Sequence, residues 1–129
     1  MLSIYKASAG SGKTHTLTLE YLLMLFRDNQ VRNQHFMPHS HILAVTFTKK
    51  ATAEMKERIL LALYTLSQYP SESQFFDDLS KQLRLDEKSI QTQARYLLIG
   101  ILQDYNRFSV STIDGFFQQV IRTFAMELG

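Results

Sequence analysis

Residues 7–14 read Ala-Ser-Ala-Gly-Ser-Gly-Lys-Thr, a Gly- and Ser-rich stretch that ends in a lysine and a threonine. The residues before it, 2–6, are short and β-prone, and a helical pattern over residues 13–27 follows it. Glycines allow a tight strand-to-helix turn in which several backbone N–H groups point at one anion. The N-terminus of the helix adds its partial positive charge at the same point. The sequence therefore predicts a phosphate-binding loop.

Two side chains extend this prediction from an anion to a nucleotide. Lys13 supplies a mobile cation for the outer phosphates, and the Thr14 hydroxyl can coordinate Mg²⁺. The strict pattern begins with Gly where this chain has Ala7. A Gly- and Ser-rich turn without a ligand is the alternative, but the glycines, the Lys-Thr pair and the strand–loop–helix context all favour phosphate binding. Kinases, GTPases, transporters, recombinases and helicases share such loops.

The amino-acid composition excludes several classes of protein. The chain has 129 residues, a formal net charge of +2 and 45% hydrophobic residues, which suits one globular domain or one lobe. It has no cysteine, which excludes disulfides and thiolate metal sites. We find neither a transmembrane stretch nor a secretory signal, so we expect a cytoplasmic protein with no membrane partner.

The order of predicted elements indicates an α/β fold. Residues 42–47 form a continuous apolar run typical of a buried parallel strand, and residues 108–112 form a third strand. We expect a loop over residues 28–41, and amphipathic helices between and after the strands. This alternation predicts a parallel sheet with helices on both faces. A sheet of three strands is small for a complete domain.

The helix ends and faces can also be predicted. Thr48 and Asp86 are placed to cap the helices that follow them, and Ser71 with Gln74 resembles a capping box. The predicted apolar faces consist of Leu17, Tyr21, Leu22, Met24, Leu25 and Phe26; Ala51, Met55, Ile59, Ala62 and Leu66; Phe75, Phe76, Leu79 and Leu83; Ile90, Ala94, Leu97, Leu98, Ile101 and Leu102; and Phe117, Val120, Ile121, Phe124 and Leu128.

A second motif, Thr46-Phe47-Thr48-Lys49, ends the buried strand. Ligand sites in open α/β sheets lie at the carboxyl ends of strands. An aromatic ring beside hydroxyls and cations offers base stacking together with phosphate contacts, as single-stranded nucleic acid requires. Taken alone, the motif is more simply explained by Phe47 in the core and Thr48 as a helix cap.

Both motifs together resemble the N-terminal ATPase lobe of superfamily 1 helicases of the UvrD/Rep type, including the RecB and AddA subunits of helicase–nucleases. That family's first motif, A-x-A-G-S-G-K-T, also begins with Ala. Its pattern A-V-T-F-T-x-K-A-A-x-E-M-x-x-R-I matches residues 44–59, with Thr52 in place of Ala. Residues 110–122, V-S-T-I-D-G-F-F-Q-Q-V-I-R, are similar to its T-I-D-S-F-F motif and nearest the RecB/AddA version.

The resemblance implies a P-loop NTPase, specifically the front part of a first RecA-like lobe over residues 1–129 with a helical insert at about residues 68–106. The whole protein would be an ATP-dependent DNA helicase or helicase–nuclease subunit that translocates on single-stranded DNA in repair or recombination. A second helicase–nuclease subunit is a further partner that the resemblance allows.

The resemblance also implies the site residues. ATP and Mg²⁺ would be held by Ala9, Gly10, Ser11, Gly12, Lys13, Thr14 and His15, with Lys13 and Thr14 catalytic and Thr14 a ligand of Mg²⁺. Single-stranded DNA would be contacted by Phe47, Thr48, Lys49, Thr112 and Asp114. His15 stands where many relatives carry an arginine.

Other interpretations of the chain stay open. A small nucleotide-binding module without motor activity is the first alternative, and a small P-loop kinase is the second, although we can assign neither a lid nor an acceptor pocket. We expect the 129 residues alone to be inactive, because no strand ends in an Asp-Glu pair and a second lobe is needed for turnover. A truncated sheet should also leave apolar surface uncovered.

Three patterns could be mistaken for metal sites. His35, His39 and His41 flank Pro38 and predict a polar surface loop rather than a metal cluster. Phe76-Asp77-Asp78 predicts a solvated helix face rather than a Mg²⁺-binding acid motif. Asp114 follows a β-like run, and its role as a metal-linked acid is a minor alternative to contact with DNA.

Overall fold

The computed structural model describes residues 11–31, 39 and 42–128, with side chains at 14–30, 39 and 42–127. The elements in chain order are α1 (Ser11–Val31), β1 (Ala44–Thr46), α2 (Lys49–Gln68), the 3₁₀ turn η2 (Pro70–Glu72), α3 (Phe76–Leu83), α4 (Glu87–Gln103), the 3₁₀ turn η3 (Tyr105–Arg107), β2 (Val110–Thr112) and α5 (Ile113–Leu128).

The two strands pair in parallel, with Ala44 opposite Val110 and Thr46 opposite Thr112. Parallel neighbours need a long crossover, which α2, α3 and α4 provide. The predicted parallel pairing is confirmed for these strands, but both are shorter than predicted. β1 begins only at Ala44 and ends before Phe47, and β2 begins only at Val110 because Phe108 caps the end of η3. The predicted strand at residues 2–6 lies outside the described residues, and helices on both sheet faces stay a prediction.

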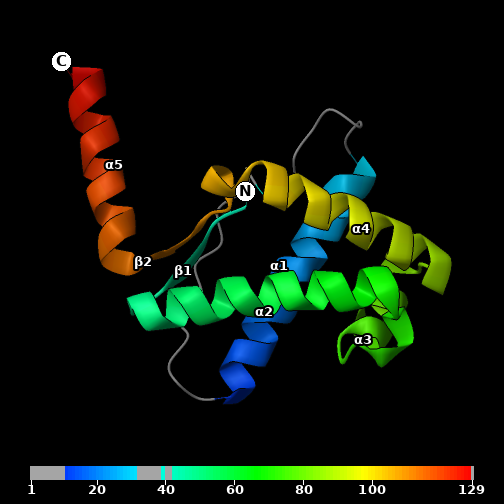
Figure 1. Cartoon of the computed structure of the whole chain (residues 1–129). Coiled ribbons are helices and arrows are strands. Elements are labelled where there is room, and N and C mark those ends of the chain that lie inside the picture. The colour runs from blue at the N-terminus through cyan, green and yellow to red at the C-terminus, as the bar shows by residue number, and fades with distance from the viewer. Residues whose placement is uncertain (1–10, 32–38, 40–41, 129) are drawn as a thin grey trace.

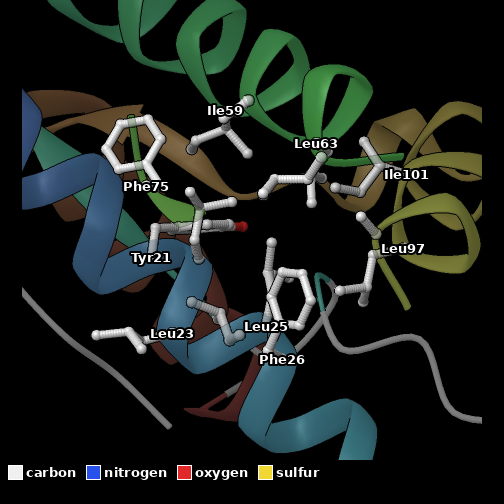
Figure 2. Packing of buried hydrophobic residues seen from close by; sticks show 14 of the residues in the cluster. Tyr21, Leu23, Leu25, Phe26, Ile59, Leu63, Phe75, Leu97 and Ile101 are labelled. Carbon is white, nitrogen blue, oxygen red and sulfur yellow. The ribbon is translucent and has the colours of Figure 1, made fainter. Parts of the chain in front are cut away.

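The core lies among α1, α2 and α4, the three longest crossing helices in Figure 1. Figure 2 shows Tyr21 and Phe26 of α1 meeting Ile59 and Leu63 of α2 and Leu97 of α4. Each fully buried side chain of this size contributes about 1.5–3 kcal/mol of burial. Because α2 contacts α1 and α4 and also packs on both strands, it fixes the sheet to the helical core.

The first helix is longer than predicted. It continues through Val31, so the loop predicted over residues 28–41 is wrong for residues 28–31. The Asn29 amide donates a hydrogen bond to Gln93 Oε1 of α4 at 3.2 Å, which holds the last turns of α1 against α4. This contact between residues far apart in the chain was not visible in local periodicity.

Two of the predicted caps are confirmed. Thr48 Oγ1 accepts a hydrogen bond from the Ala51 N–H at 3.0 Å, and the Asp86 carboxylate accepts one from the Ser89 N–H at 2.8 Å. The predicted capping box at Ser71 is wrong, because Pro70 starts a 3₁₀ turn there and α3 begins only at Phe76.

The Phe76-Asp77-Asp78 motif lies in the first turn of α3, where Asp77 is exposed. Its interpretation as a helix face is confirmed. Carboxylates at that position interact favourably with the N-terminal end of the helix dipole.

The surface-loop prediction is wrong for His39, which is only 1% exposed. Its Nε2 lies 3.1 Å from the Asp104 carbonyl oxygen and 3.3 Å from the Asp104 Oδ2. Both partners accept hydrogen bonds, so Nε2 carries the proton and donates. His35 and His41 lie outside the described residues, and within the described part no three potential metal ligands cluster together.

Apolar side chains are exposed on several of the described helices. On α4, Leu102 was predicted to face the core but is 59% exposed. On α5, which projects away from the helical core in Figure 1, the predicted apolar face is open, including Phe117, Ile121 and Phe124. The uncovered apolar surface expected from the sequence is therefore present among the described residues, and a large part of it lies on α5. Among the described helices, none combines the length and apolarity that crossing a bilayer requires.

We predict that His39→Ala lowers the free energy of unfolding by about 2–3 kcal/mol, since it opens a cavity and strips Asp104 of its buried donor. Arg107→Ala is the control, because Arg107 approaches the same carboxylate at 3.8 Å but is 72% exposed. Its loss should cost less than about 0.5 kcal/mol. Urea unfolding of both variants checks this, and equal effects would show that the buried His39–Asp104 contact contributes no more than the exposed Arg107–Asp104 pair.

Candidate nucleotide and nucleic-acid site

The carboxyl ends of β1 and β2 lie at one edge of the sheet, because Thr46 is paired with Thr112. The residues that follow these ends are Phe47, Thr48 and Lys49 on one side and Asp114 on the other. We call Phe47, Thr48, Lys49, Thr112 and Asp114 the strand-end edge. Neighbouring parallel strands lie about 4.8 Å apart, so these segments start close together.

A buried hydroxyl holds this edge in place. Thr46 Oγ1 lies 2.6 Å from Thr52 Oγ1 of α2 and 3.2 Å from the Thr48 carbonyl oxygen. It also lies 3.4 Å from the Ser111 carbonyl oxygen of β2. Thr52 in turn donates to the Thr48 carbonyl at 3.1 Å. Thr46 and Thr52 therefore join both strands to the first turn of α2, a role that the sequence did not indicate.

Phe47 is exposed at the turn that joins β1 to α2. Its side chain is 49% exposed, so the alternative in which it belongs to the core is wrong. The ring has open surface on which a flat ligand can stack. Whether DNA uses that surface stays a prediction.

The start of α2 is electropositive. Lys49 and Lys50 occupy its first turn, which has no acidic residue. Cations at a helix N-terminus face the positive end of the dipole, an arrangement unfavourable by a few tenths of a kcal/mol and offset when an anion binds. Thr48, whose Oγ1 caps the helix, lies at the same point. These features suit contact with a phosphate.

The second half of the edge begins α5. Thr112 Oγ1 accepts a hydrogen bond from the Gly115 N–H at 3.1 Å, and a Cβ on Gly115 would lie 3.1 Å from the same oxygen. The Thr112 side chain is thereby fixed, with Asp114 exposed beside it in the first turn of α5. The Asp114 carboxylate suits the dipole of α5 but would repel a phosphate brought close to it.

The phosphate-loop prediction falls partly outside the described residues, which exclude Ala9 and Gly10. Ser11, Gly12, Lys13 and Thr14 form the first turn of α1. N–H groups in the first turn of a helix have no acceptor within the helix, and this turn carries no acidic residue that would repel an anion. The backbone therefore fits a bound phosphate group.

His15 is held by the segment that precedes α3. Its ring stacks on Phe75 with the centroids 4.7 Å apart and an interplanar angle of 20°. Phe75 is buried, so its position is fixed by the core. A contact of His15 with nucleotide stays a prediction.

The structure also reveals a groove that was not predicted from the sequence. It has a volume of about 820 Å³ and runs between α2 and α4, and we call it the α2–α4 groove. Its lining includes Lys49, Lys56, Tyr64, Leu98, Tyr105 and Thr112. The α2 residues of the lining recur at three- and four-residue intervals, so they form a second stripe along the helix beside its buried apolar face. This periodicity is the sequence signal from which the groove could have been predicted.

Comparisons with known proteins agree with the motifs. The chain matches the UvrD/REP helicase N-terminal domain over residues 3–129, and it belongs to this family. It is 40% identical over 93 residues to a probable DNA helicase II homolog of Mycoplasma capricolum, covering 72% of this chain and 12% of that protein.

Two further relatives are subunits of helicase–nucleases. RecBCD enzyme subunit RecB of Escherichia coli is 32% identical over 98% of this chain and 11% of its own length. An ATP-dependent helicase/nuclease subunit of Lactobacillus gasseri is 33% identical over 94% of this chain and 8% of its own length. The chain thus spans about a tenth of the length of these relatives. No solved structure matches it significantly.

We predict that Thr46→Val lowers the free energy of unfolding by about 1–2 kcal/mol, because it keeps the side-chain shape and removes the hydroxyl shared by β1, β2 and α2. Thr123→Val is the matched control, since the exposed Thr123 hydroxyl donates a hydrogen bond to the Gln119 carbonyl within the same helix, α5. Urea unfolding should show little change in the control. A Thr46→Val protein as stable as the unaltered chain would contradict the role given to this hydroxyl.

Proposed function

We propose that this chain is the ATP-binding front part of the first RecA-like lobe of an ATP-dependent DNA helicase or helicase–nuclease subunit, with an insert at about residues 68–106. Single-stranded DNA crosses its strand-end edge. The observation that carries the proposal is the convergence of Phe47, Lys49 and Thr112 where two parallel strands end. Membership of the UvrD/REP family and the DNA helicases among its relatives support it.

At the strand-end edge, each residue type has a separate task. The exposed Phe47 ring stacks on a base, a contact that tolerates any sequence. Lys49, at the positive end of α2, attracts the backbone phosphates, while the hydroxyls of Thr48 and Thr112 can donate to phosphate oxygens. Asp114 sits at the margin, where its charge directs phosphates toward the lysine side.

At the nucleotide site, residues 9–15 cradle the phosphates of ATP. The first turn of α1 offers its backbone N–H groups, and Lys13 neutralises the outer phosphates. Thr14 would bind Mg²⁺, which when present neutralises charge on the β- and γ-phosphates. His15, packed on Phe75, borders this site on the side of the segment before α3. We propose that the chain alone binds nucleotide but does not turn it over.

A nucleotide-binding module without motor activity is the rival. Such a module would bind nucleotide through the same phosphate loop but would not bind single-stranded DNA at the strand-end edge. Oligonucleotide binding with and without an ATP analogue separates the two proposals. An affinity for single strands that changes when the analogue is added supports the helicase lobe, and nucleotide binding without any binding of single strands supports the rival.

We predict that Phe47→Ala weakens binding of a fluorescein-labelled decathymidylate about ten-fold, because stacking contributes about 1–3 kcal/mol per base. Fluorescence anisotropy at fixed salt measures the affinity. Tyr69→Ala is the control, since Tyr69 is also an exposed aromatic but lies at the far end of α2. Equal affinity of the Phe47→Ala and unaltered proteins, both folded, would remove Phe47 from the DNA path.

We predict that Lys13→Ala weakens binding of a fluorescent ATP analogue by about 10- to 100-fold, the effect of losing a hydrogen bond to a charged group. Lys88→Ala, an exposed lysine in the first turn of α4, is the control. Titration in the presence of Mg²⁺ measures both variants. Unchanged affinity of Lys13→Ala would refute the phosphate-loop assignment without affecting the DNA-binding edge.

A further inference from the structure

The α2–α4 groove opens directly onto the strand-end edge. Lys49 and Thr112 belong to both, so a strand leaving the edge meets the groove without crossing other surface. From Lys49 to Tyr64 the groove follows α2 for about 22 Å, at about 1.5 Å per residue. This length suits about six nucleotides at a stacked spacing of about 3.4 Å.

The groove carries a cation that lies on aromatic rings. Lys56 Nζ is 5.2 Å from the Tyr105 ring centroid and 5.7 Å from that of Phe108. Phe108 is buried and meets Tyr105 edge-on at 5.8 Å, so a fixed core residue supports the Tyr105 ring while 45% of Tyr105 is exposed. Among the described side chains, no carboxylate forms an ion pair with Lys56. Its charge therefore remains available to a ligand.

A second exposed aromatic, Tyr64, lies at the far end of the groove and is 55% exposed. The two walls are fixed relative to each other, because Gln91 of α4 donates hydrogen bonds to the Ser67 and Gln68 carbonyls at the end of α2. The groove is thus preformed, with the Tyr64 ring on α2 and the Tyr105 ring in the turn η3 that follows α4. Preformed stacking surfaces lower the entropy lost on binding.

We propose that the α2–α4 groove binds the continuation of the single strand beyond the strand-end edge, with bases on Tyr64 and Tyr105 and backbone phosphates at Lys49 and Lys56. This inference rests on the proposed function. The choice of nucleic acid follows from the charge of the lining, two lysines against Glu57 alone, and from its two open tyrosine rings. An acidic amphipathic helix of another protein is the competing occupant, and the test separates the two.

The experiment compares fluorescein-labelled tetra- and decathymidylate by anisotropy, because the shorter strand fills only the edge. We expect the double variant Tyr64→Ala/Tyr105→Ala to lose at least ten-fold affinity for the decamer and to change little for the tetramer. Phe47→Ala should weaken both. Tyr64→Phe/Tyr105→Phe, which keeps the rings, should retain decamer binding. Circular dichroism and thermal melting verify that each variant is folded.

The salt dependence gives a second readout. Lys56→Gln should lower the slope of log K against log[salt] for the decamer by about 0.7, the value for one phosphate contact on a single strand. Lys88→Gln is the matched control and should leave the slope unchanged.

Three outcomes would overturn the inference. Unaltered decamer affinity in the double alanine variant, while Phe47→Ala weakens binding, leaves the proposed function intact and removes the groove from the DNA path. If that double variant instead changes self-association or capture of an acidic helical peptide without changing DNA affinity, the groove is a protein-docking surface. Failure of the unaltered chain to bind either strand refutes the proposed function and the inference with it.

Discussion

The parallel pairing of Thr46 with Thr112 is the contact on which the candidate DNA-binding edge depends. These residues are far apart in the chain, and only the crossover through α2, α3 and α4 brings the two strand ends together. The buried Thr46 hydroxyl fixes the junction, since it reaches Thr52 on α2 and the backbone of β2. A loss of this register would separate Phe47 and Lys49 from Thr112.

The second helix serves both the core and the surface. One stripe of α2, with Met55, Ile59 and Leu63, is buried against α1 and α4. The adjoining stripe, with Lys49, Lys56 and Tyr64, lines the groove. Because both stripes belong to one rigid helix, the energy that buries the first also orients the second. Rigid elements hold binding side chains more accurately than loops do.

Much of the structure could be predicted from local sequence. The caps at Thr48 and Asp86 and the buried faces of α1 and α2 follow from short-range periodicity and hydrogen-bonding chemistry. The features that could not be predicted depend on partners distant in the chain. His39 is buried and its Nε2 donates a hydrogen bond to Asp104, and Leu102 lines the α2–α4 groove instead of the core. The roles of Thr46 and Tyr105 likewise depend on contacts made only in the folded chain.

Backbone amide shifts during a titration of the ¹⁵N-labelled chain with decathymidylate test the central claim most directly, because they report where the strand lies without any substitution. We expect the largest shifts at residues 47–49 and 112–114, where the strands end together. Shifts confined to α3 and the exposed face of α5, with residues 47–49 and 112–114 unchanged at saturating oligonucleotide, would contradict the claim.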